Sequence, residues 1–326
     1  MNLTDSTLMV RVAKRCIEAD GIASFELVDL DGRDLPPFDA GAHIDVYVPG
    51  GPVRQYSLSN APTERHRYQI AVLRDAQSRG GSQGMHDAVR AGDTIRIGVP
   101  RNHFPLARQT AKPLLFAGGI GITPILCMAE HLAASGLAFE MHYCARARER
   151  AAFVERIDAS AWAGNVRYHF DDEHGVIDLN GLMAEAAPVA GNAGRHLYVC
   201  GPQGFMNAVL DTARSAGFTD DRLHFEYFAA APEPSGDTAS FDVRLARSGR
   251  VVTVPADCTV TQALAAAGVE VPVACEQGVC GTCLTRVLEG EPEHRDVFLS
   301  PDEQARNDQF LPCCSRSKSR VLVLDL

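Results

Sequence analysis

The sequence lacks the features of a membrane protein, a secreted protein and a nucleic-acid-binding protein. Its 31 Lys and Arg residues are outnumbered by 41 Asp and Glu, and the net charge of −10 repels phosphate backbones and anionic lipid surfaces. The first residues, Met1 to Asp5, have neither the basic start nor the apolar core of a signal peptide. The uncharged run over residues 113–129 is interrupted by glycines and a proline. These absences predict a cytoplasmic protein with no membrane contact and no nucleic-acid partner.

The residues that are present suffice for several globular domains. A length of 326 residues, with 46% apolar and 22% charged residues, predicts two or three domains with buried cores. Ten cysteines in a chain expected to be cytoplasmic favour metal or redox chemistry over disulfides, because four of them lie between Cys275 and Cys313.

The hydrophobic pattern changes twice along the chain. Apolar and polar residues alternate from residue 8 to about 99, which predicts a small antiparallel barrel. Beyond residues 105–113, strand-like runs alternate with helical ones, as in a parallel sheet. Residues 229–240 have no apolar periodicity, and after them come two alternating strands and a short helix over residues 259–267. We therefore expect a multidomain protein with an antiparallel β-barrel (1–108), an α/β parallel-sheet domain (109–229), a linker (230–239) and a small α+β domain (240–326).

The strongest local pattern is the cysteine loop Cys275-x4-Cys280-x2-Cys283. This spacing is that of a plant-type [2Fe-2S] site, and the small residues Ala274, Gly278, Gly281 and Thr282 allow the loop to wrap one cluster with its N–H groups pointing at the sulfurs. Zinc is the alternative, since Cys280-x2-Cys283 alone suits a zinc knuckle. The segment resembles plant-type ferredoxins, in which 29 residues separate the third and fourth cysteines. That count ends on Cys313 and leaves Cys314 for core packing.

The other cysteines and the histidines show no ligand-like spacing. We interpret them as structural residues, and they are Cys16, Cys127, Cys144, Cys258, His142, His169, His174 and His196.

Two glycine turns predict a dinucleotide crevice. The first, Gly118-Gly119-Ile-Gly121-Ile-Thr123-Pro124, joins a strand to a helix, with Thr123 as the expected N-cap and Pro124 as the first helical residue. A glycine turn needed only for close packing is the alternative. The second turn is Cys200-Gly201-Pro202. No acidic residue follows the second strand, where Arg146 and Arg148 stand instead, so NADH and NADPH are both left open.

Two segments of the barrel suggest a phosphorylated planar cofactor. Arg54-Gln-Tyr56-Ser57 places a cation, an aromatic ring and a hydroxyl on one strand, and Arg79-Gly80-Gly81-Ser82 opens a short helix with donors suited to a phosphate.

These motifs, together with residues 100–105 and the chain's last strand, resemble the phthalate dioxygenase reductase family along essentially the whole chain. Vanillate O-demethylase reductase subunits are similar. The resemblance implies FMN in the barrel, NADH in the α/β domain, and a β-grasp, plant-type ferredoxin domain that passes electrons to a separate Rieske-type oxygenase. We expect the reductase to work as a monomer.

The resemblance also implies roles for individual residues. Tyr56 would pack on the flavin, Ser57 would bond near its reactive nitrogen, and backbone contacts would come from Ala71, Val72 and Leu73. The ribityl phosphate would be held by Arg54, Arg79, Gly80, Gly81 and Ser82. Thr123 and Cys200 would lie beside the nicotinamide and act with Ser57 as the catalytic residues. Residues 225–228, ending in Phe228, would close the site or end a core strand.

The mechanism that follows is hydride transfer from NADH to FMN, then single-electron steps to the cluster. One rival is a stand-alone flavin NAD(P)H dehydrogenase with a structural metal domain, and another is a ferredoxin-like carrier joined to a nucleotide-sensing domain. As a further hypothesis, Glu289, Glu291 and Glu293 steer the last domain to a basic patch on the oxygenase, with a solvated acidic hairpin as the alternative.

Overall fold

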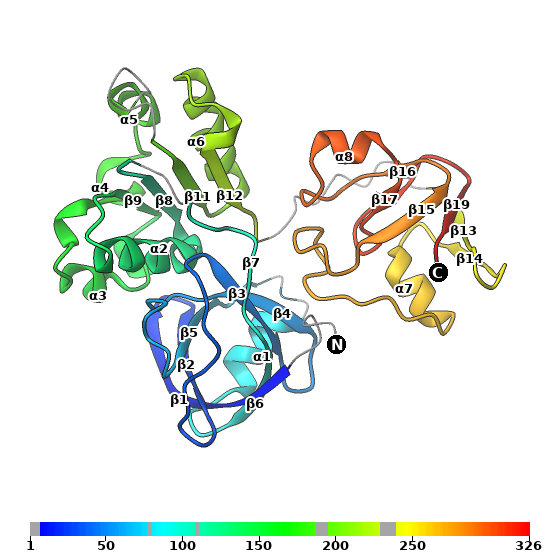
Figure 1. Ribbon diagram of the computed structural model, residues 1–326, viewed down its shortest axis with the longest axis horizontal. Coiled ribbons are helices and arrows are strands. Elements are labelled where there is room, and N and C mark those ends of the chain that lie inside the picture. The colour runs from blue at the N-terminus through cyan, green and yellow to red at the C-terminus, as the bar shows by residue number, and fades with distance from the viewer. Residues whose placement is uncertain (1–6, 77, 79, 108–110, 187–194, 229–238) are drawn as a thin grey trace. The chain divides into compact units, whose positions relative to one another are not determined.

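The computed structural model describes residues 7–76, 78, 80–107, 111–186, 195–228 and 239–326. By their contacts they form two compact units, Met1–Glu226 and Tyr227–Leu326. The first unit holds two sheets (Figure 1). The predicted three-domain boundaries stay a prediction, and most of the predicted linker lies outside the described residues. No helix in the described ranges is long and apolar enough to span a membrane.

The first sheet is the antiparallel barrel expected from the alternating pattern. Its strands follow the order β4-β3-β6-β1-β2-β5, with β7 paired to β3, and a bridge between Leu58 and Ile70 links the segment after β4 to β5. Alternate residues such as Val10, Val12, Phe25 and Leu27 are fully buried. Its elements are β1 Thr7–Ala19, β2 Ile22–Asp29, β3 Ala42–Tyr47, β4 Val53–Ser57, β5 Tyr68–Leu73, α1 Gly81–Ala88, β6 Thr94–Gly98 and β7 Arg101–Asn102.

The second sheet of this unit is parallel, in the order β10-β9-β8-β11-β12. Helices α2 and α3 cover one face and α5 and α6 the other (Figure 1). Strands buried on both faces explain why β8 reads as a continuous apolar run. The elements are β8 Leu114–Gly118, α2 Ile122–Ala134, β9 Glu140–Ala145, α3 Val154–Asp158, β10 Val166–Phe170, α4 Asp171–His174, α5 Leu179–Ala186, β11 Leu197–Cys200, α6 Gln203–Ser215 and β12 Leu223–Glu226.

The predicted start of α2 is wrong by two residues. Gly121 is the N-cap and Ile122 the first helical residue, so that Thr123 and Pro124 lie inside the first turn. The Thr123 hydroxyl donates to the Ile120 carbonyl at 3.1 Å instead of capping the helix. A short 3₁₀ turn over Gly119–Gly121 starts the helical backbone early, which a residue-type pattern does not reveal.

The second unit is a small α+β fold. Its main sheet has the order β14-β13-β19-β15-β17, and β16 pairs with β18. Thr259 caps the predicted helix through a capping box with Gln262, and Gly268 follows it at φ +76°. The elements are β13 Phe241–Leu245, β14 Val251–Val254, α7 Val260–Ala266, β15 Thr285–Glu289, β16 Pro292–Glu293, α8 Pro301–Ala305, β17 Gln309–Phe310, β18 Arg316–Ser317 and β19 Val321–Leu324.

Candidate functional site

The two glycine turns of the parallel sheet meet at its carboxyl edge, as predicted. Strands β8 and β11 are neighbours in parallel register, so their last residues lie side by side. A Cβ on Gly121 would stand 2.2 Å from the Cys200 carbonyl oxygen, and one on Gly201 would stand 2.9 Å from the Cα of Gly118. Only glycine permits this approach. The two turns therefore lie together at the strand ends where α/β sheets bind ligands, and we call this place the nucleotide crevice.

The predicted flavin strand joins this crevice through Ser57. The hydroxyl of Ser57, at the end of β4, donates to the carboxylate of Glu226, the last residue of β12, at 3.2 Å. Cys200 pairs with Glu226 in the parallel register and is fully buried. Burial and the Ser57 bond set the pKa of Glu226 at about 7, because desolvation outweighs the hydrogen bond. Burial beside Glu226 also raises the pKa of the Cys200 thiol, which is therefore neutral at pH 7.

Glu226 is the one residue of this cluster that the pattern of the sequence left undecided. A core strand and a site-closing segment were equally consistent with residues 225–228. The surroundings of a carboxylate at a strand end that faces another sheet depend on tertiary packing, and the residue pattern does not show them. Phe228 lies two residues further on, in the second unit, so its place beside the flavin stays a prediction.

The expected phosphate-binding residues come together at the start of α1. Gly80, with φ +89°, precedes the helix, and a Cβ on Gly81 would stand 2.6 Å from the Cγ of Arg54. The Ser82 hydroxyl accepts from the N–H of Asp75 at 3.1 Å. Arg79 lies outside the described residues. The Arg54 side chain and the N–H groups of the first helical turn thus form a cradle with positive potential.

The remaining flavin-strand residues differ in exposure. Ala71 and Val72, on β5, are buried, whereas Leu73 is 41% exposed. Burial raises the pKa of Tyr56, so its hydroxyl keeps its proton at neutral pH. Across the unit, the Tyr198 hydroxyl on β11 accepts from the N–H of Ala107 at 2.8 Å, and Arg156 bonds to both Glu130 and Gln69. These contacts fix the barrel against the parallel sheet, and with it the position of Ser57 relative to Glu226.

Four buried cysteines of the second unit lie together. Cys275, Cys280, Cys283 and Cys313 are each less than 9% exposed, and the Cys275 thiol interacts with those of Cys280 and Cys313. In the described part of the chain, no group of three or more His, Cys, Asp or Glu is arranged around a single metal ion. A [2Fe-2S] cluster instead needs two thiolates on each of two irons. Cys275 packs with Cys280 in one buried cluster and Cys283 packs with Cys313 in another, and these two pairs fit that requirement.

The loop between the cysteines has the conformation that the spacing predicted. Gly278 and Gly281 adopt φ +73° and +70°. The N–H groups of Gln277 and Thr282 point at the sulfurs of Cys275 and Cys280, at 3.3 and 3.5 Å. The Cys314 sulfur lies 3.6 Å from the Leu311 carbonyl oxygen, and its thiol also interacts with that of Cys313. Donors aimed at sulfur stabilise an anionic cluster, so these residues suit an iron–sulfur group.

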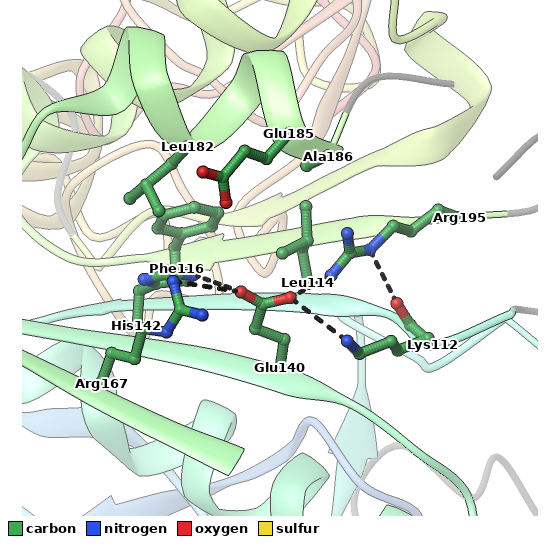
Figure 2. A pocket seen from close by; sticks show the side chains of 10 residues that line it. All are labelled: Lys112, Leu114, Phe116, Glu140, His142, Arg167, Leu182, Glu185, Ala186 and Arg195. Atoms are coloured by element: carbon green, nitrogen blue, oxygen red, sulfur yellow. Dashed lines mark hydrogen bonds and ion pairs between the residues drawn. The ribbon is translucent and has the colours of Figure 1, made fainter. Parts of the chain in front are cut away.

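A separate pocket lies at the opposite, amino ends of β8 and β9. It encloses about 300 Å³. Figure 2 shows Glu140 at its centre, between Lys112 and Arg195 on one side and His142 and Arg167 on the other. The Arg195 guanidinium lies 2.7 Å from the Glu140 carboxylate. Parallel α/β sheets bind nucleotides at the carboxyl ends of their strands, so this pocket is not part of the nucleotide crevice.

This pocket corrects one expectation. His142 and His169 were interpreted as scattered side chains without a carboxylate, yet the His142 ring lies 3.3 Å from Glu140 and bonds to His169 at 3.0 Å. His196 similarly bonds to His224 at 2.7 Å. Adjacent parallel strands bring these pairs together over large sequence separations. Burial lowers the pKa of all four rings, to about 4 for His142 and His224, so they are neutral near pH 7, and their structural role stays a prediction.

Fold and site together define an electron-transfer oxidoreductase that combines a flavin barrel, a nucleotide sheet and a ferredoxin-like unit. Residues 243–318 match the family model described as a 2Fe-2S iron–sulfur cluster binding domain. The chain is 57% identical over 308 residues to vanillate O-demethylase oxidoreductase of Pseudomonas sp. strain HR199, covering 94% of this chain and 96% of that protein. It is 41% identical to phthalate dioxygenase reductase of Burkholderia cepacia, covering 99% and 98%.

A solved structure supports the same class. It is described as "Phthalate dioxygenase reductase: a modular structure for electron transfer from pyridine nucleotides to [2Fe-2S]", and it superposes with a TM-score of 0.80 at 41% identity, covering 99% of this chain and 98% of that one. The chain belongs to the family of oxygenase reductases that includes phthalate dioxygenase reductase and vanillate O-demethylase oxidoreductase. The predicted family, fold class and enzyme class are confirmed, and the iron–sulfur interpretation replaces the zinc alternative.

Proposed function

We propose that this chain is the reductase of a two-component O-demethylase, and that it passes electrons from NADH through FMN and the cluster to a terminal oxygenase. The observation that carries the proposal is the hydrogen bond between Ser57 and Glu226. It joins the predicted flavin strand to the carboxyl edge of the nucleotide sheet, where hydride donor and acceptor must meet. Three relatives named vanillate O-demethylase oxidoreductase are 57%, 55% and 48% identical, above the 41% of phthalate dioxygenase reductase, which favours O-demethylation.

The residues would share the work as follows. Arg54, Gly80, Gly81 and Ser82, with Arg79 beyond the described residues, would bind the phosphate of FMN, while Tyr56 would cover its ring and residues 71–73 its edge. The floor beneath the dinucleotide would be formed by the two glycine turns, with Gly118, Gly119, Gly121, Pro124, Gly201 and Pro202. The flavin, when bound, supplies the conversion between a two-electron donor and a one-electron acceptor.

Glu226 is the residue that would take up and release protons at this site. Its pKa of about 7 lets it hold or release a proton near neutral pH, and the Ser57 hydroxyl connects it to the barrel. Cys200 and Thr123 would orient the nicotinamide by contact, because the Cys200 thiol is neutral and the Thr123 hydroxyl is already used by the Ile120 carbonyl. The four cysteine thiolates would hold the cluster at the exit.

NADH is favoured over NADPH by the charges around the end of β9. Of the two arginines expected there, Arg148 pairs with Asp158 at 3.1 Å and lies over the Tyr168 ring. The next strand, β10, ends just before Asp171. Burial and, after it, the Asp171 carboxylate raise the pKa of the Cys144 thiol, which places negative charge beside the end of β9. A 2′-phosphate would meet this negative charge, whereas a ribose hydroxyl could donate to it. The test is the ratio of KM values for the two nucleotides.

The decisive experiment is an anaerobic NADH titration of the purified protein, followed by visible spectra. We expect flavin bleaching together with the spectral change of a reduced [2Fe-2S] cluster, FMN on release, and iron and acid-labile sulfide in equal amounts. Zinc in place of iron would support the stand-alone dehydrogenase with a structural metal domain. Loss of NADH-driven cytochrome c reduction would support the nucleotide sensor.

We also propose that the reductase acts as a monomer in the cytoplasm. Four of the ten cysteines have the spacing of cluster ligands, which favours a reducing compartment over a disulfide scaffold. Sedimentation velocity at micromolar concentration tests the monomer, and a stable dimer would contradict it.

A further inference from the structure

A buried histidine of the barrel, His43, has no hydrogen-bond partner in the described part of the chain. It is 4% exposed, and neither Nδ1 nor Nε2 finds a donor or acceptor there. Nearly all buried polar groups in folded proteins are paired, because an unpaired one destabilises the fold. The imidazole therefore needs a partner beyond the residues that the structure describes, such as a bound ligand.

The position of His43 indicates which partner that is. His43 lies on β3 directly opposite Ser57 of β4 in the antiparallel register. Residues that face each other in this way have their side chains on the same side of the sheet, about 5 Å apart. Ser57 is the residue that bonds to Glu226 at the end of β12. His43 thus stands at the edge of the barrel that meets the nucleotide crevice.

The groups around His43 keep its ring neutral. The His103 ring stacks on the His43 ring, with 5.3 Å between the ring centroids. Arg101 of β7 lies opposite His43 in the antiparallel register, and its guanidinium forms an ion pair with Asp45 at 2.6 Å. Burial, His103 and Arg101 together lower the pKa of His43 to about 3. A neutral imidazole carries one N–H donor and one acceptor nitrogen. It can therefore make two hydrogen bonds at this edge.

We propose that His43 is a positioning residue of the flavin site, which exchanges one hydrogen bond with the polar edge of the bound flavin and one with the Ser57 hydroxyl. In the second bond the imidazole N–H donates to the Ser57 oxygen, which leaves the bond from the Ser57 hydroxyl to Glu226 in place. The inference rests on the proposed function, because Ser57 is placed beside the flavin there. A buried water satisfying both nitrogens is the alternative.

The experiment compares flavin affinity with the stability of the flavin-free protein. His43→Leu removes both polar atoms at similar volume. We expect the dissociation constant for FMN, measured by fluorescence titration, to rise about threefold to tenfold. The melting temperature of the flavin-free protein should stay equal or rise, because an unpaired polar group is gone. The two changes have opposite signs, which loss of folding cannot produce.

Two further variants complete the design. His43→Gln keeps a donor and an acceptor and should restore most of the FMN affinity. His174→Leu makes the same substitution at a side chain 76% exposed and should leave FMN affinity unchanged. The midpoint potential of the bound flavin should shift in His43→Leu and recover in His43→Gln.

The outcomes separate the two proposals. Wild-type FMN affinity and potential in His43→Leu would overturn the role of His43 and assign its partner to water, while the proposed function would stand. Weaker NADH binding with unchanged FMN binding would overturn it as well. A wild-type protein that binds no flavin would overturn the proposed function itself.

Discussion

The cluster loop and the flavin crevice are built in opposite ways. Three of the four proposed cluster ligands fall within nine consecutive residues, Cys275 to Cys283, and the loop geometry comes from two local glycines. In the crevice, Ser57 and Glu226 are 169 positions apart and meet only because a barrel and a parallel sheet pack together. A site carried by one loop can be inferred from spacing, whereas a site assembled across sheets depends on packing that spacing does not encode.

The largest effect is expected from a substitution in the cluster loop, which leaves the flavin crevice intact. Cys280→Ser should lower NADH-driven reduction of cytochrome c by more than about a hundredfold, because losing a ligand costs more than losing an outer-shell partner. Flavin bleaching by NADH should persist, since the crevice is separate. Stopped-flow absorbance and iron analysis measure the two steps.

Cys314→Ser is the matched control, because Cys314 is adjacent to the fourth ligand but turns toward Leu311. It should retain iron and turnover. Equal iron loss in Cys314→Ser and Cys313→Ser would contradict the assignment of the fourth ligand.

The second prediction disturbs the assembled site. In Gly121→Ala the new Cβ would lie 2.2 Å from the Cys200 carbonyl oxygen, and backbone on both sides cannot yield easily. Overpacking of this kind costs about 1–3 kcal/mol, so nucleotide affinity should fall roughly tenfold to a hundredfold. Isothermal titration with NAD⁺ measures it.

Gly164→Ala provides the control, since a Cβ at that position would meet nothing within 4 Å and its φ is not positive. It should bind NAD⁺ as the wild type does. An unchanged affinity in Gly121→Ala would mean that the two turns do not share the nucleotide.

The same contrast explains what could be predicted from the sequence. The strand alternation of the barrel, the short helix expected over residues 259–267 and the glycines of the cysteine loop are local features, and all appear in the structure. The helix start at Ile122 was missed because backbone geometry, not residue type, places it. The residue pattern could not show the contact of His142 with Glu140 or the desolvation of Glu226, because neighbouring strands supply those environments.

The third prediction uses the half-buried carboxylate of Glu226 in the assembled site. The pKa of Glu226 is about 7 in the folded chain against an ordinary value of 4.5, so the native state binds the extra proton between these values. Stability from this group is therefore complete below pH 4.5 and is lost as pH rises toward 7. Glu226→Gln should remove the loss, so that at pH 8 it is more stable than wild type by up to about 3 kcal/mol.

Urea unfolding at pH 5 and pH 8 measures this effect. The difference between Glu226→Gln and wild type should be small at pH 5 and large at pH 8. A difference independent of pH would show that the carboxyl titrates normally in the folded protein.

The smallest effect concerns the acidic residues after the cluster loop. Glu289, Glu291 and Glu293 were expected on a hairpin, but β15 and β16 do not pair with each other; β16 pairs with β18 instead. Each carboxylate has a cation of its own chain: Arg244 at 3.1 Å, Lys318 at 3.2 Å and Arg295 at 2.9 Å. Paired charges project a weaker field than free ones, which disfavours the steering of an oxygenase by these three residues.

Reversing all three to lysine should therefore change turnover with the oxygenase less than about twofold and cost no more than about 1 kcal/mol for each exposed pair. Asp257→Lys, an exposed reversal elsewhere in the same unit, serves as the comparison. Turnover is measured across a range of salt concentrations, because steering depends on ionic strength. If the triple variant alone lost turnover and its salt dependence, the acidic residues would be the docking surface despite their partners, and intramolecular pairing would be a poor guide to which surface charges act at long range.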